Sequence, residues 1–312
     1  MKFSITIPAY KAKFLYEAID SVLKQTYDDF ELIIVDDCSP EDLKSIVDKF
    51  SDSRIRYYRN ERNCGAEHVV DNWNISLGYC SGDWVICMGD DDMLMPNCLE
   101  EYAKAIQQYP SVDLLHARVR QIDEKGDLIT ILPERPQFQS AYSFITGRMT
   151  GYSQYIGDFC FRTTRLRKEG GFFDLPFAWG ADDVSAFACS YPGGVANVNV
   201  PIFCYRINRF SISNSRNEEK KLRALLGEEV WLTNFASIQQ TKNELEEEEL
   251  KCLINAIPDG MQRARYYVLY YNYHFGNLSI LRWLFVGRKY NIKFRTVIKV
   301  LVYKIIGKFT LL

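Results

Sequence analysis

The sequence predicts an α/β protein with a mostly parallel central sheet flanked by helices, followed by a helical C-terminal extension. Strand and helix patterns alternate over roughly the first hundred residues, and after residue 214 the apolar spacing becomes mainly helical. Clusters of aspartate follow two of the predicted strands, at the sheet edge where ligands gather in such folds. A chain of 312 residues with 47% hydrophobic content is long enough to bury a sizeable core.

The elements of this first part follow from short apolar runs separated by helical spacing. The runs predict buried strands at residues 3–7, 31–35, 55–58 and 83–88. The intervening apolar residues, spaced three and four apart, predict helices at residues 15–23, 43–50 and 69–77. This alternation is typical of a parallel sheet with helices on both faces.

The middle of the chain, residues 110–210, has a more mixed pattern. Residues 114–122 and 128–132 predict a hairpin around a turn at 124–127, and residues 151–162 predict a further strand. The helical part that follows residue 214 contains a solvated acidic run at residues 244–249.

Composition excludes several classes of protein. A net charge of −2 argues against nucleic acid as the main partner. The nine cysteines form no C-x-x-C pair and there are only three histidines, so we expect neither a zinc site nor a disulfide framework, and a reducing cytosol is the simpler compartment. The first apolar run is broken by Pro8 and is too short for a signal peptide. No uncharged apolar stretch reaches about 18 residues, so we expect no membrane-spanning helix.

The sequence MGDDDM at residues 88–93 is the sharpest chemical feature. Three adjacent aspartates after a buried strand repel one another, and this repulsion needs a compensating charge or solvent. A solvated turn or a helix N-cap is one explanation. The other is a hard-cation site, in which the carboxylates hold Mg²⁺ or Mn²⁺ and the metal grips a diphosphate and stabilises its charge on departure.

Two further acidic pairs allow a structural and a functional interpretation. Asp36 and Asp37 end the second predicted strand, where they either start a helix or share a ligand with the aspartate triplet. Asp182 and Asp183 lie in WGADDVSAF and either cap a helix or serve an acceptor hydroxyl. In the second case one carboxylate acts as general base, while its neighbour binds the acceptor and raises the pKa of the base.

Four blocks in the first 105 residues carry a resemblance to a known family. In order, they are ITIPAY, LIIVDDCSP, NERNCGAEHVVDNWN and SGDWVICMGDDDMLMPNCLE. Their order and spacing resemble the GT-A-fold family 2 glycosyltransferases, which have a Rossmann-like sheet. The resemblance is strong over residues 3–105, looser to about residue 215, and fades beyond.

This resemblance implies a metal-dependent, inverting sugar transfer without a glycosyl-enzyme intermediate. The donor would be a nucleotide-diphosphate sugar, with a UDP-sugar favoured, and the cofactor Mn²⁺ or Mg²⁺. The acceptor would be a glycan or a lipid-linked saccharide in cell-surface polysaccharide synthesis. Residues 1–215 would form the GT-A domain, with a nucleotide-binding half at 1–105 and an acceptor half at 106–215, and residues 216–312 a helical region.

The resemblance also implies roles for individual residues. The nucleotide pocket would be formed by Pro8, Ala9, Tyr10, Asp37, Asn63 and Gly65. The metal and diphosphate would be contacted by Asp90, Asp91, Asp92 and Arg206. Of these, Asp92 would be a metal ligand and Asp91 would lie in the ribose or metal shell. Arg206, in a segment that continues with Ser211, Ser213 and Asn214, would close over the diphosphate. Asp183 would be the base and Asp182 its companion.

The sequence departs from the family pattern at three positions. Gly89 replaces the first aspartate of the common Asp-x-Asp spacing, so Asp90 takes part of the metal role in this interpretation. Asp182 stands where glutamate is more usual, and Asp71 replaces an arginine often found before the asparagine, here Asn72. These departures affect the identity of the donor more than the reaction class.

The C-terminal segment 282–312 combines basic charge with an apolar stripe. It contains eight Lys or Arg residues and no Asp or Glu, and its apolar residues recur at helical spacing from Phe294 to Phe309. One interpretation is an ordinary helix packed on the protein. The other is an interfacial helix on an anionic cytoplasmic leaflet, with Trp283 and Phe285 contributing, which would make the protein cytoplasmic and peripheral to the membrane.

Three other classes of function compete with a glycosyltransferase. A nucleotidyltransferase-like enzyme should carry a glycine-rich phosphate loop near the N-terminus, but residues 7–13 contain no glycine. A catalytically silent nucleotide-sugar-binding protein is disfavoured by the presence of both Asp92 and Asp183. A glycoside hydrolase also uses paired acids, but it has no use for the nucleotide-pocket blocks.

Overall fold

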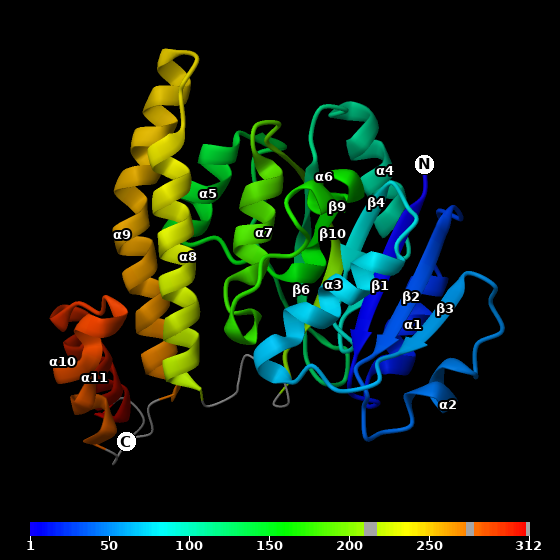
Figure 1. Cartoon of the computed structure of the whole chain (residues 1–312), viewed down its shortest axis with the longest axis horizontal. Coiled ribbons are helices and arrows are strands. Elements are labelled where there is room, and N and C mark those ends of the chain that lie inside the picture. The colour runs from blue at the N-terminus through cyan, green and yellow to red at the C-terminus, as the bar shows by residue number, and fades with distance from the viewer. Residues whose placement is uncertain (209–216, 273–277, 310–312) are drawn as a thin grey trace.

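The structure is a computed structural model of the chain. It describes the backbone of residues 1–208, 217–272 and 278–309, and the side chains of residues 1–208, 217–271 and 280–303. Figure 1 shows a sheet domain that contains the N-terminus and, beside it, a layer of long helices that leads to the C-terminal end.

The N-terminal part forms the predicted parallel sheet. Its elements are β1 (Phe3–Ala9), α1 (Leu15–Leu23), β2 (Phe30–Asp36), α2 (Leu43–Val47), β3 (Ile55–Arg59), η1 (Ala66–His68), α3 (Val69–Tyr79) and β4 (Trp84–Cys87). The four strands lie in the order β3-β2-β1-β4, all parallel. Ala9 pairs with Asp36 in register, so the segments that follow β1 and β2 emerge at the same edge. The predicted strands and helices of this part are confirmed.

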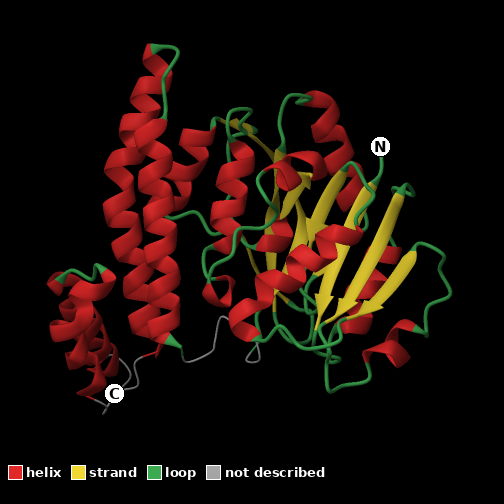
Figure 2. Ribbon diagram, viewed as in Figure 1, coloured by secondary structure: helices red, strands yellow, loops and turns green. Residues whose placement is uncertain are grey.

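The next part of the chain extends this sheet in a mixed arrangement. Its elements are β5 (Met93–Leu94), α4 (Cys98–Gln108), β6 (Leu114–Ile122), β7 (Leu128–Ile131), β8 (Phe138–Gln139), α5 (Ala141–Thr150), η2 (Ile156–Asp158), β9 (Phe159–Arg162), α6 (Thr163–Lys168), η3 (Pro176–Ala178), α7 (Ala181–Ser190) and β10 (Val195–Arg206). The full order is β3-β2-β1-β4-β9-β6-β10-β5. Strand β9 is antiparallel to both neighbours, so the sheet is parallel only up to β4 and mixed beyond it (Figure 2).

The predicted hairpin of β6 and β7 is confirmed, but the strand predicted over residues 151–162 is wrong for most of its length. Gly151, with φ +140°, ends α5, and the backbone then makes a tight turn in which Tyr155 N–H donates to the Asp158 side chain. Only Phe159–Arg162 pairs in the sheet. The apolar residues there indicated a buried segment without fixing its conformation.

The C-terminal region is helical, as predicted. It contains α8 (Glu218–Ile238), α9 (Glu244–Asn272), η5 (Leu278–Arg282), α10 (Trp283–Val286), η6 (Gly287–Tyr290) and α11 (Phe294–Phe309). Helices α8 and α9 form an antiparallel pair that packs on α5 and α7, and α11 packs on α9 with α10 beside it, near one end of the pair (Figure 1). No helix in the described ranges combines the length and apolar character that crossing a bilayer requires.

Two hydrophobic cores lie on opposite faces of the sheet. Along β2, Leu32 and Ile34 face one core while Ile33 and Val35 face the other, because successive side chains of a strand point to opposite sides. The second core continues through α5 and α7 into α8, α9 and α11, where it includes Val297 and Val300. The C-terminal helices therefore share a core with the sheet and are not a separate appendage.

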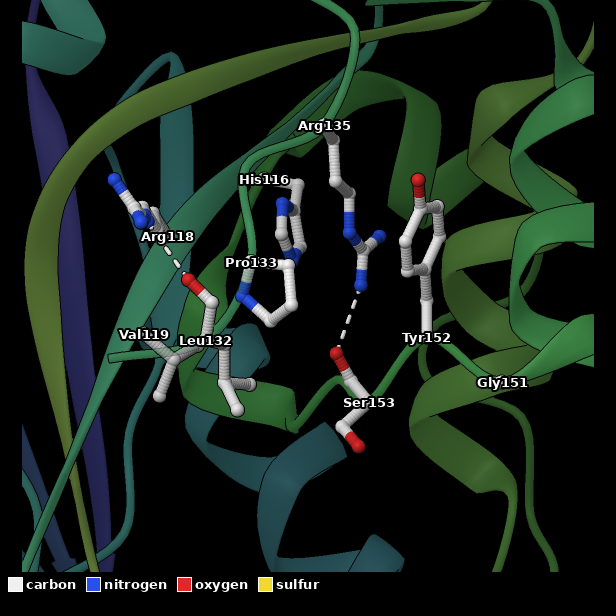
Figure 3. Close-up of a pocket in the computed structure, with 9 residues that line it drawn as sticks. All are labelled: His116, Arg118, Val119, Leu132, Pro133, Arg135, Gly151, Tyr152 and Ser153. Carbon is white, nitrogen blue, oxygen red and sulfur yellow. Dashed lines mark hydrogen bonds between the residues drawn. The ribbon is translucent and has the colours of Figure 1, made fainter. Parts of the chain in front are cut away.

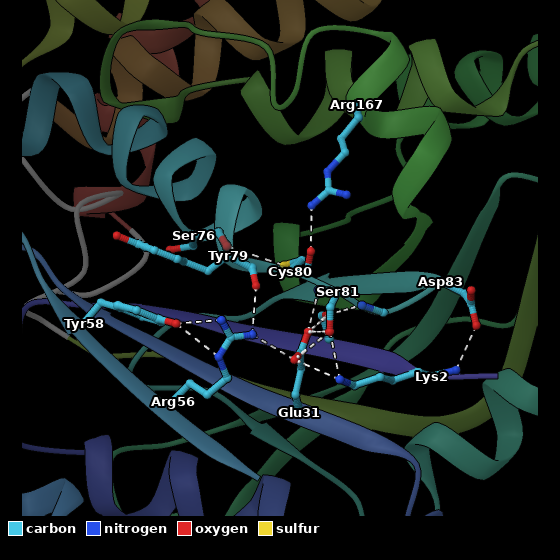
Figure 4. A network of polar contacts seen from close by, with 12 residues as sticks. Lys2, Glu31, Arg56, Tyr58, Ser76, Tyr79, Cys80, Ser81, Asp83 and Arg167 are labelled. Carbon is cyan, nitrogen blue, oxygen red and sulfur yellow. Dashed lines mark hydrogen bonds and ion pairs between the residues drawn. The ribbon is translucent and has the colours of Figure 1, made fainter.

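A polar network around Glu31 fastens the amino ends of the strands, opposite the edge where the aspartate clusters lie (Figure 4). The buried Glu31 carboxylate accepts hydrogen bonds from Ser4 Oγ at 2.7 Å, from Ser81 N at 2.6 Å, and from Lys2 Nζ and Arg56 Nη1 at 3.0 Å. Burial alone would raise the pKa of Glu31, but the bonds from Ser4, Ser81 and Lys2 outweigh it and lower the pKa to about 2. This carboxylate is a structural anchor for β1, β2 and β3.

Candidate active site

The segments that follow β1, β2 and β4 meet at the carboxyl edge of the sheet. Backbone N–H groups of Tyr10 and Lys11 both donate to Asp90 Oδ2 at 2.7 Å, which joins the end of β1 to the aspartate triplet. Asp37 N–H donates to the Ala9 carbonyl at 2.9 Å, which joins the ends of β1 and β2. The predicted residues Pro8, Ala9, Tyr10, Asp37 and Asp90 are thus neighbours in space.

The Asp37 carboxylate organises the loop that carries Asn63 and Gly65. It accepts hydrogen bonds from Asn60 Nδ2 at 2.9 Å, from Asn63 Nδ2 at 3.0 Å and from Cys64 N at 3.0 Å. Gly65 follows with φ +82°, a conformation that favours glycine. The structure therefore places Asn63 and Gly65 beside Asp37, and their contact with a nucleotide stays a prediction.

Gly89 leaves a space into which two aspartate oxygens of the triplet point. The position that a Cβ would occupy at Gly89 lies 2.8 Å from Asp91 Oδ1 and 3.0 Å from Asp92 Oδ2. The other oxygens are engaged, because Asp91 Oδ2 accepts from Asn208 Nδ2 at 2.6 Å and Asp92 Oδ1 accepts from Arg206 N at 2.9 Å. The departure from Asp-x-Asp at residue 89 thus creates a cradle that a side chain would fill.

This cradle fits a divalent cation whose coordination is completed by the phosphates of a bound ligand. Burial, followed by the charge of Asp91, raises the pKa of Asp90 to about 6 and that of Asp92 well above its usual value. The described residues contain no group of three or more His, Cys, Asp or Glu side chains placed to hold a metal. Mg²⁺ is commonly bound by one or two carboxylates together with substrate phosphates, which matches the pair Asp91 and Asp92.

Arg206 lies beneath the aspartate turn, with its side chain fully buried. Its Nε–H donates to the Asp91 carbonyl at 2.8 Å, its Nη2 pairs with Glu17 at 2.6 Å, and its guanidinium stacks 4.4 Å from the centre of the Phe14 ring. These contacts fix the turn that carries Asp91 and Asp92. Contact of Arg206 with a diphosphate stays a prediction, and Ser211, Ser213 and Asn214 lie outside the described residues.

A second carboxylate cluster lies at the start of α7. The buried Asp183 carboxylate accepts from Arg148 Nε at 2.9 Å through both oxygens and from Gln154 Nε2 at 2.7 Å. Burial and the neighbouring Asp183 charge raise the pKa of Asp182 to about 7. Gly180, with φ +82°, makes the turn into the helix. Arg148 and Gln154 were not predicted from the sequence, because neither belongs to a recognisable motif.

Tyr155 connects the two clusters. Its ring stacks on Tyr205 with centroids 3.8 Å apart, and Gln121 Nε2 donates to its hydroxyl at 2.8 Å. Burial is the largest influence that raises the pKa of Tyr155, and the charges of both Arg148 and Asp92 act on it as well. Tyr155 directly follows Gln154, which donates to Asp183, and its partner Tyr205 directly precedes Arg206, whose backbone N–H donates to Asp92. The stacked tyrosines therefore link the segments that contact the two clusters.

A cavity of about 70 Å³ lies behind the Asp183 cluster, and Figure 3 shows its lining. In it Arg135 Nη2 donates to the Ser153 carbonyl at 2.8 Å and Nη1 donates to Gln154 Oε1 at 3.3 Å, which orients the amide that binds Asp183. Both ring nitrogens of His116 are buried without a hydrogen-bond partner, and Nε2 lies 3.7 Å from Asp158 Oδ2. Burial, followed by the Arg135 charge, lowers the pKa of His116 well below its usual value. The cavity has room for ordered water beside the polar groups of Arg135 and Ser153.

Comparison with known proteins identifies the family of the chain. A family model described as Glycosyl transferase family 2 matches residues 4–169, which is more than half of the chain.

Curated relatives and a solved structure agree with this match. An uncharacterized glycosyltransferase of Haemophilus influenzae is 33% identical over 137 residues, 43% of this chain but only 45% of that protein. UDP-Glc:α-D-GlcNAc-diphosphoundecaprenol β-1,3-glucosyltransferase WfgD of Escherichia coli is 26% identical over 224 residues, covering 70% of this chain and 82% of the relative. The poly(ribitol-phosphate) β-N-acetylglucosaminyltransferase TarS of Staphylococcus aureus, solved as residues 1–349 with UDP-GlcNAc, superposes with a TM-score of 0.65 at 19% identity, over 98% of this chain and 92% of that structure. At that identity the superposition establishes the fold.

Proposed function

The chain belongs to glycosyl transferase family 2 and is a glycosyltransferase, and from this premise we propose that it transfers a sugar from a UDP-sugar to a hydroxyl group of a glycan or lipid-linked saccharide, with inversion. The observation that carries the proposal is that the stacked pair Tyr155 and Tyr205 links the Asp91–Asp92 cradle to the Asp183–Arg148 pair, through the neighbouring residues Arg206 and Gln154. The Asp91–Asp92 cradle has the chemistry to hold a diphosphate through a cation, and Asp183 has the chemistry to take a proton from the acceptor. The bound UDP-GlcNAc of TarS and the lipid-linked acceptor named for WfgD support these substrate classes.

In this proposal the donor binds at the carboxyl edge of the parallel strands. Pro8, Ala9, Tyr10 and the loop organised by Asp37, with Asn63 and Gly65, contact the uridine. Asp91 and Asp92 hold Mn²⁺ or Mg²⁺, with Asp90 fixing the turn to the backbone of β1. When bound, the cation supplies stabilisation of the negative charge on the departing UDP. Arg206 maintains the turn from below, and its contact with the diphosphate stays part of the proposal.

The acceptor hydroxyl is activated by Asp183. Both Asp183 oxygens accept a hydrogen bond from Arg148 Nε, which keeps the carboxylate oriented. As the acceptor oxygen forms its bond to the anomeric carbon, its proton passes to Asp183, and the bond from that carbon to the UDP oxygen breaks. A single displacement places the new bond on the opposite face, so the product has inverted configuration. Asp182 binds the acceptor beside the base.

We also propose that the C-terminal helices rest on an anionic membrane at its cytoplasmic face. Val297 and Val300 of α11 are buried, so part of the predicted stripe packs on the protein. Phe285 is 83% exposed and Phe294 is 66% exposed. The exposed basic residues near them in the sequence are Arg288, Lys289, Lys293, Arg295 and Lys299. Trp283, predicted to join this surface, is buried. Exposed aromatic residues among cations suit a surface that carries a lipid-linked acceptor.

Donor and acceptor panels test the proposed reaction. UDP-glucose, UDP-galactose and UDP-N-acetylglucosamine are tested in thermal shift with and without Mn²⁺, and a ligand at a hundredfold excess over its Kd stabilises by about 2.7 kcal/mol. UDP release is then measured with GlcNAc-diphosphoundecaprenol and with poly(ribitol phosphate). We expect Mn²⁺-dependent stabilisation and UDP release with one pair. Pyrophosphate release would instead indicate a nucleotidyltransferase, and binding without turnover a silent binding protein.

A further inference from the structure

Glu228 carries a buried carboxyl group that has no role in the proposed reaction. It lies on α8, outside residues 4–169 matched by the family model, and its side chain is 3% exposed. Among the described residues none donates a hydrogen bond to it. Its carboxyl group can therefore form hydrogen bonds to a ligand.

The position of Glu228 against the Asp182–Asp183 turn is fixed by close packing. A Cβ added at Gly180 would lie 2.6 Å from Glu228 Oε2, so the carboxyl group lies directly against the backbone that enters α7. One residue earlier on α8, a Cβ at Gly227 would lie 2.7 Å from Leu175 Cδ2. Glycines on both elements thus allow α8 and the segment 175–183 to approach closely.

Neighbouring charges place Glu228 in the same cluster as the proposed base. Burial, followed by the charge of Asp183, raises the pKa of Glu228 well above its usual value, and Arg148 and Asp182 also act on it. Arg148 already pairs with Asp183, so the cluster favours the protonated form of Glu228. A protonated carboxyl group offers one O–H donor and one carbonyl acceptor, which is the pair that binds a sugar hydroxyl.

We propose that Glu228 binds a hydroxyl group of the acceptor saccharide beside Asp183, so that helix α8 completes the acceptor side of the site. Further contacts of α8 fit this placement. Lys220 Nζ pairs with Glu67 Oε2 at 2.5 Å, and Lys221 Nζ lies 4.4 Å from the centre of the Trp179 ring. Helix α8 therefore contacts both the nucleotide half and the acceptor half. The inference rests on the proposed function, because it takes Asp183 as the base.

The test compares Glu228→Leu with Glu228→Gln, using the UDP-sugar and acceptor pair that releases most UDP in the panel above. Gln keeps the shape and both hydrogen-bonding functions of the neutral acid, so we expect its acceptor KM to stay within about threefold of wild type. Leu removes both functions, so we expect the acceptor KM to rise about tenfold, the equivalent of one lost hydrogen bond. The Kd for UDP and the melting temperature of Glu228→Leu should stay level or improve, because an apolar side chain suits a buried site. Glu219→Gln, an exposed glutamate on the same helix, is the matched control and should change neither.

A second pair of variants tests the placement without changing Glu228. Gly180→Ala should displace the Glu228 carboxyl and raise the acceptor KM, whereas Gly170→Ala has a similar φ, +91°, and open space around it, so it controls for backbone strain. An unchanged acceptor KM in Glu228→Leu would overturn the Glu228 inference but not the proposed function. An equal rise of the acceptor KM in the Gln and Leu variants would do the same. Absence of UDP release by the wild type with every pair would overturn the proposed function and this inference together.

Discussion

Replacing Asp183 by asparagine separates the chemistry of the proposed base from its structural contacts. The asparagine would keep the size of the side chain and an oxygen that accepts from Gln154 Nε2, which lies 2.7 Å from Asp183 Oδ1, but it would lack the basicity of the carboxylate. General-base catalysis contributes about 10²–10⁴-fold, which corresponds to about 3–5 kcal/mol of transition-state stabilisation. We therefore expect kcat to fall by that factor in Asp183→Asn.

The same substitution has a smaller expected effect on stability. It leaves Arg148 without its charged partner, but the Arg148 side chain is 35% exposed, so water compensates part of the loss. We expect a cost of about 1–2 kcal/mol, well below the cost of breaking a fully buried ion pair. The variant should therefore stay folded, and its Kd for UDP with Mn²⁺ should be unchanged because the donor contacts lie on other strands.

The assay follows UDP release at saturating donor and acceptor, with isothermal titration for UDP binding. Asp182→Asn is the matched comparison and should lose less, mainly through acceptor KM. NMR of the new linkage should show inverted anomeric configuration. Near-normal turnover by Asp183→Asn would refute its role as base, and retained configuration would refute the single displacement.

Three further predictions follow from the structure. Gly89→Ala should weaken Mn²⁺-dependent binding of UDP at least tenfold in titration calorimetry, because the new Cβ would lie 2.8 Å from Asp91 Oδ1. The control Gly78→Ala, which has no atom within 4 Å of its Cβ, should leave this binding unchanged. EDTA and Asp92→Ala should abolish turnover, and full activity in EDTA would contradict the metal role. The double variant Arg295→Glu, Lys299→Glu should co-sediment less with phosphatidylserine vesicles and keep its UDP affinity. High salt should also reduce co-sedimentation of the wild type. Equal sedimentation of variant and wild type would contradict the proposal that this surface binds a membrane. Glu31→Gln should destabilise the folded protein by about 1–2 kcal/mol at pH 7, a value reduced because the partners Lys2 and Arg56 are partly exposed. Because the folded pKa of Glu31 is depressed to about 2, its contribution to stability is present above pH 4.5 and is lost as the pH falls toward 2. Chemical denaturation curves of variant and wild type should therefore converge near pH 2.

The sequence was most informative where the chemistry coincides with strand ends. Asp37 and the aspartate triplet directly follow buried strands, and parallel strands bring their carboxyl ends to one edge, so their proximity could be predicted from order alone. The packing of Arg206 could not. A lone arginine after a strand has the same appearance whether it faces a phosphate or lies buried under a turn, and only the positions of Glu17 and Phe14 decide between these.

The partners of Asp183 were beyond the reach of the sequence for a related reason. Arg148 is on α5 and Glu228 is on α8, and these helices meet α7 only because the core continues across all of them. Neither residue lies in a pattern that distinguishes it from the solvated charges of an ordinary helix. The start and the antiparallel direction of β9 were also missed, because a strand of four residues gives too short a pattern to define them.

The division of the site between two parts of the chain explains where the family resemblance ends. In the proposed function, any UDP-sugar presents the same nucleotide and diphosphate to the edge formed by β1, β2 and β4, and the family match covers this edge. The acceptor differs from one enzyme to another, and on its side the proposed contacts come from Asp183 and from α8, both beyond residue 169. If Glu228 binds the acceptor, then changes at Glu228 should alter acceptor KM while UDP affinity stays constant, and changes at Gly89 should do the reverse. Independent responses of this kind are expected only if the two clusters contact different substrates across Tyr155.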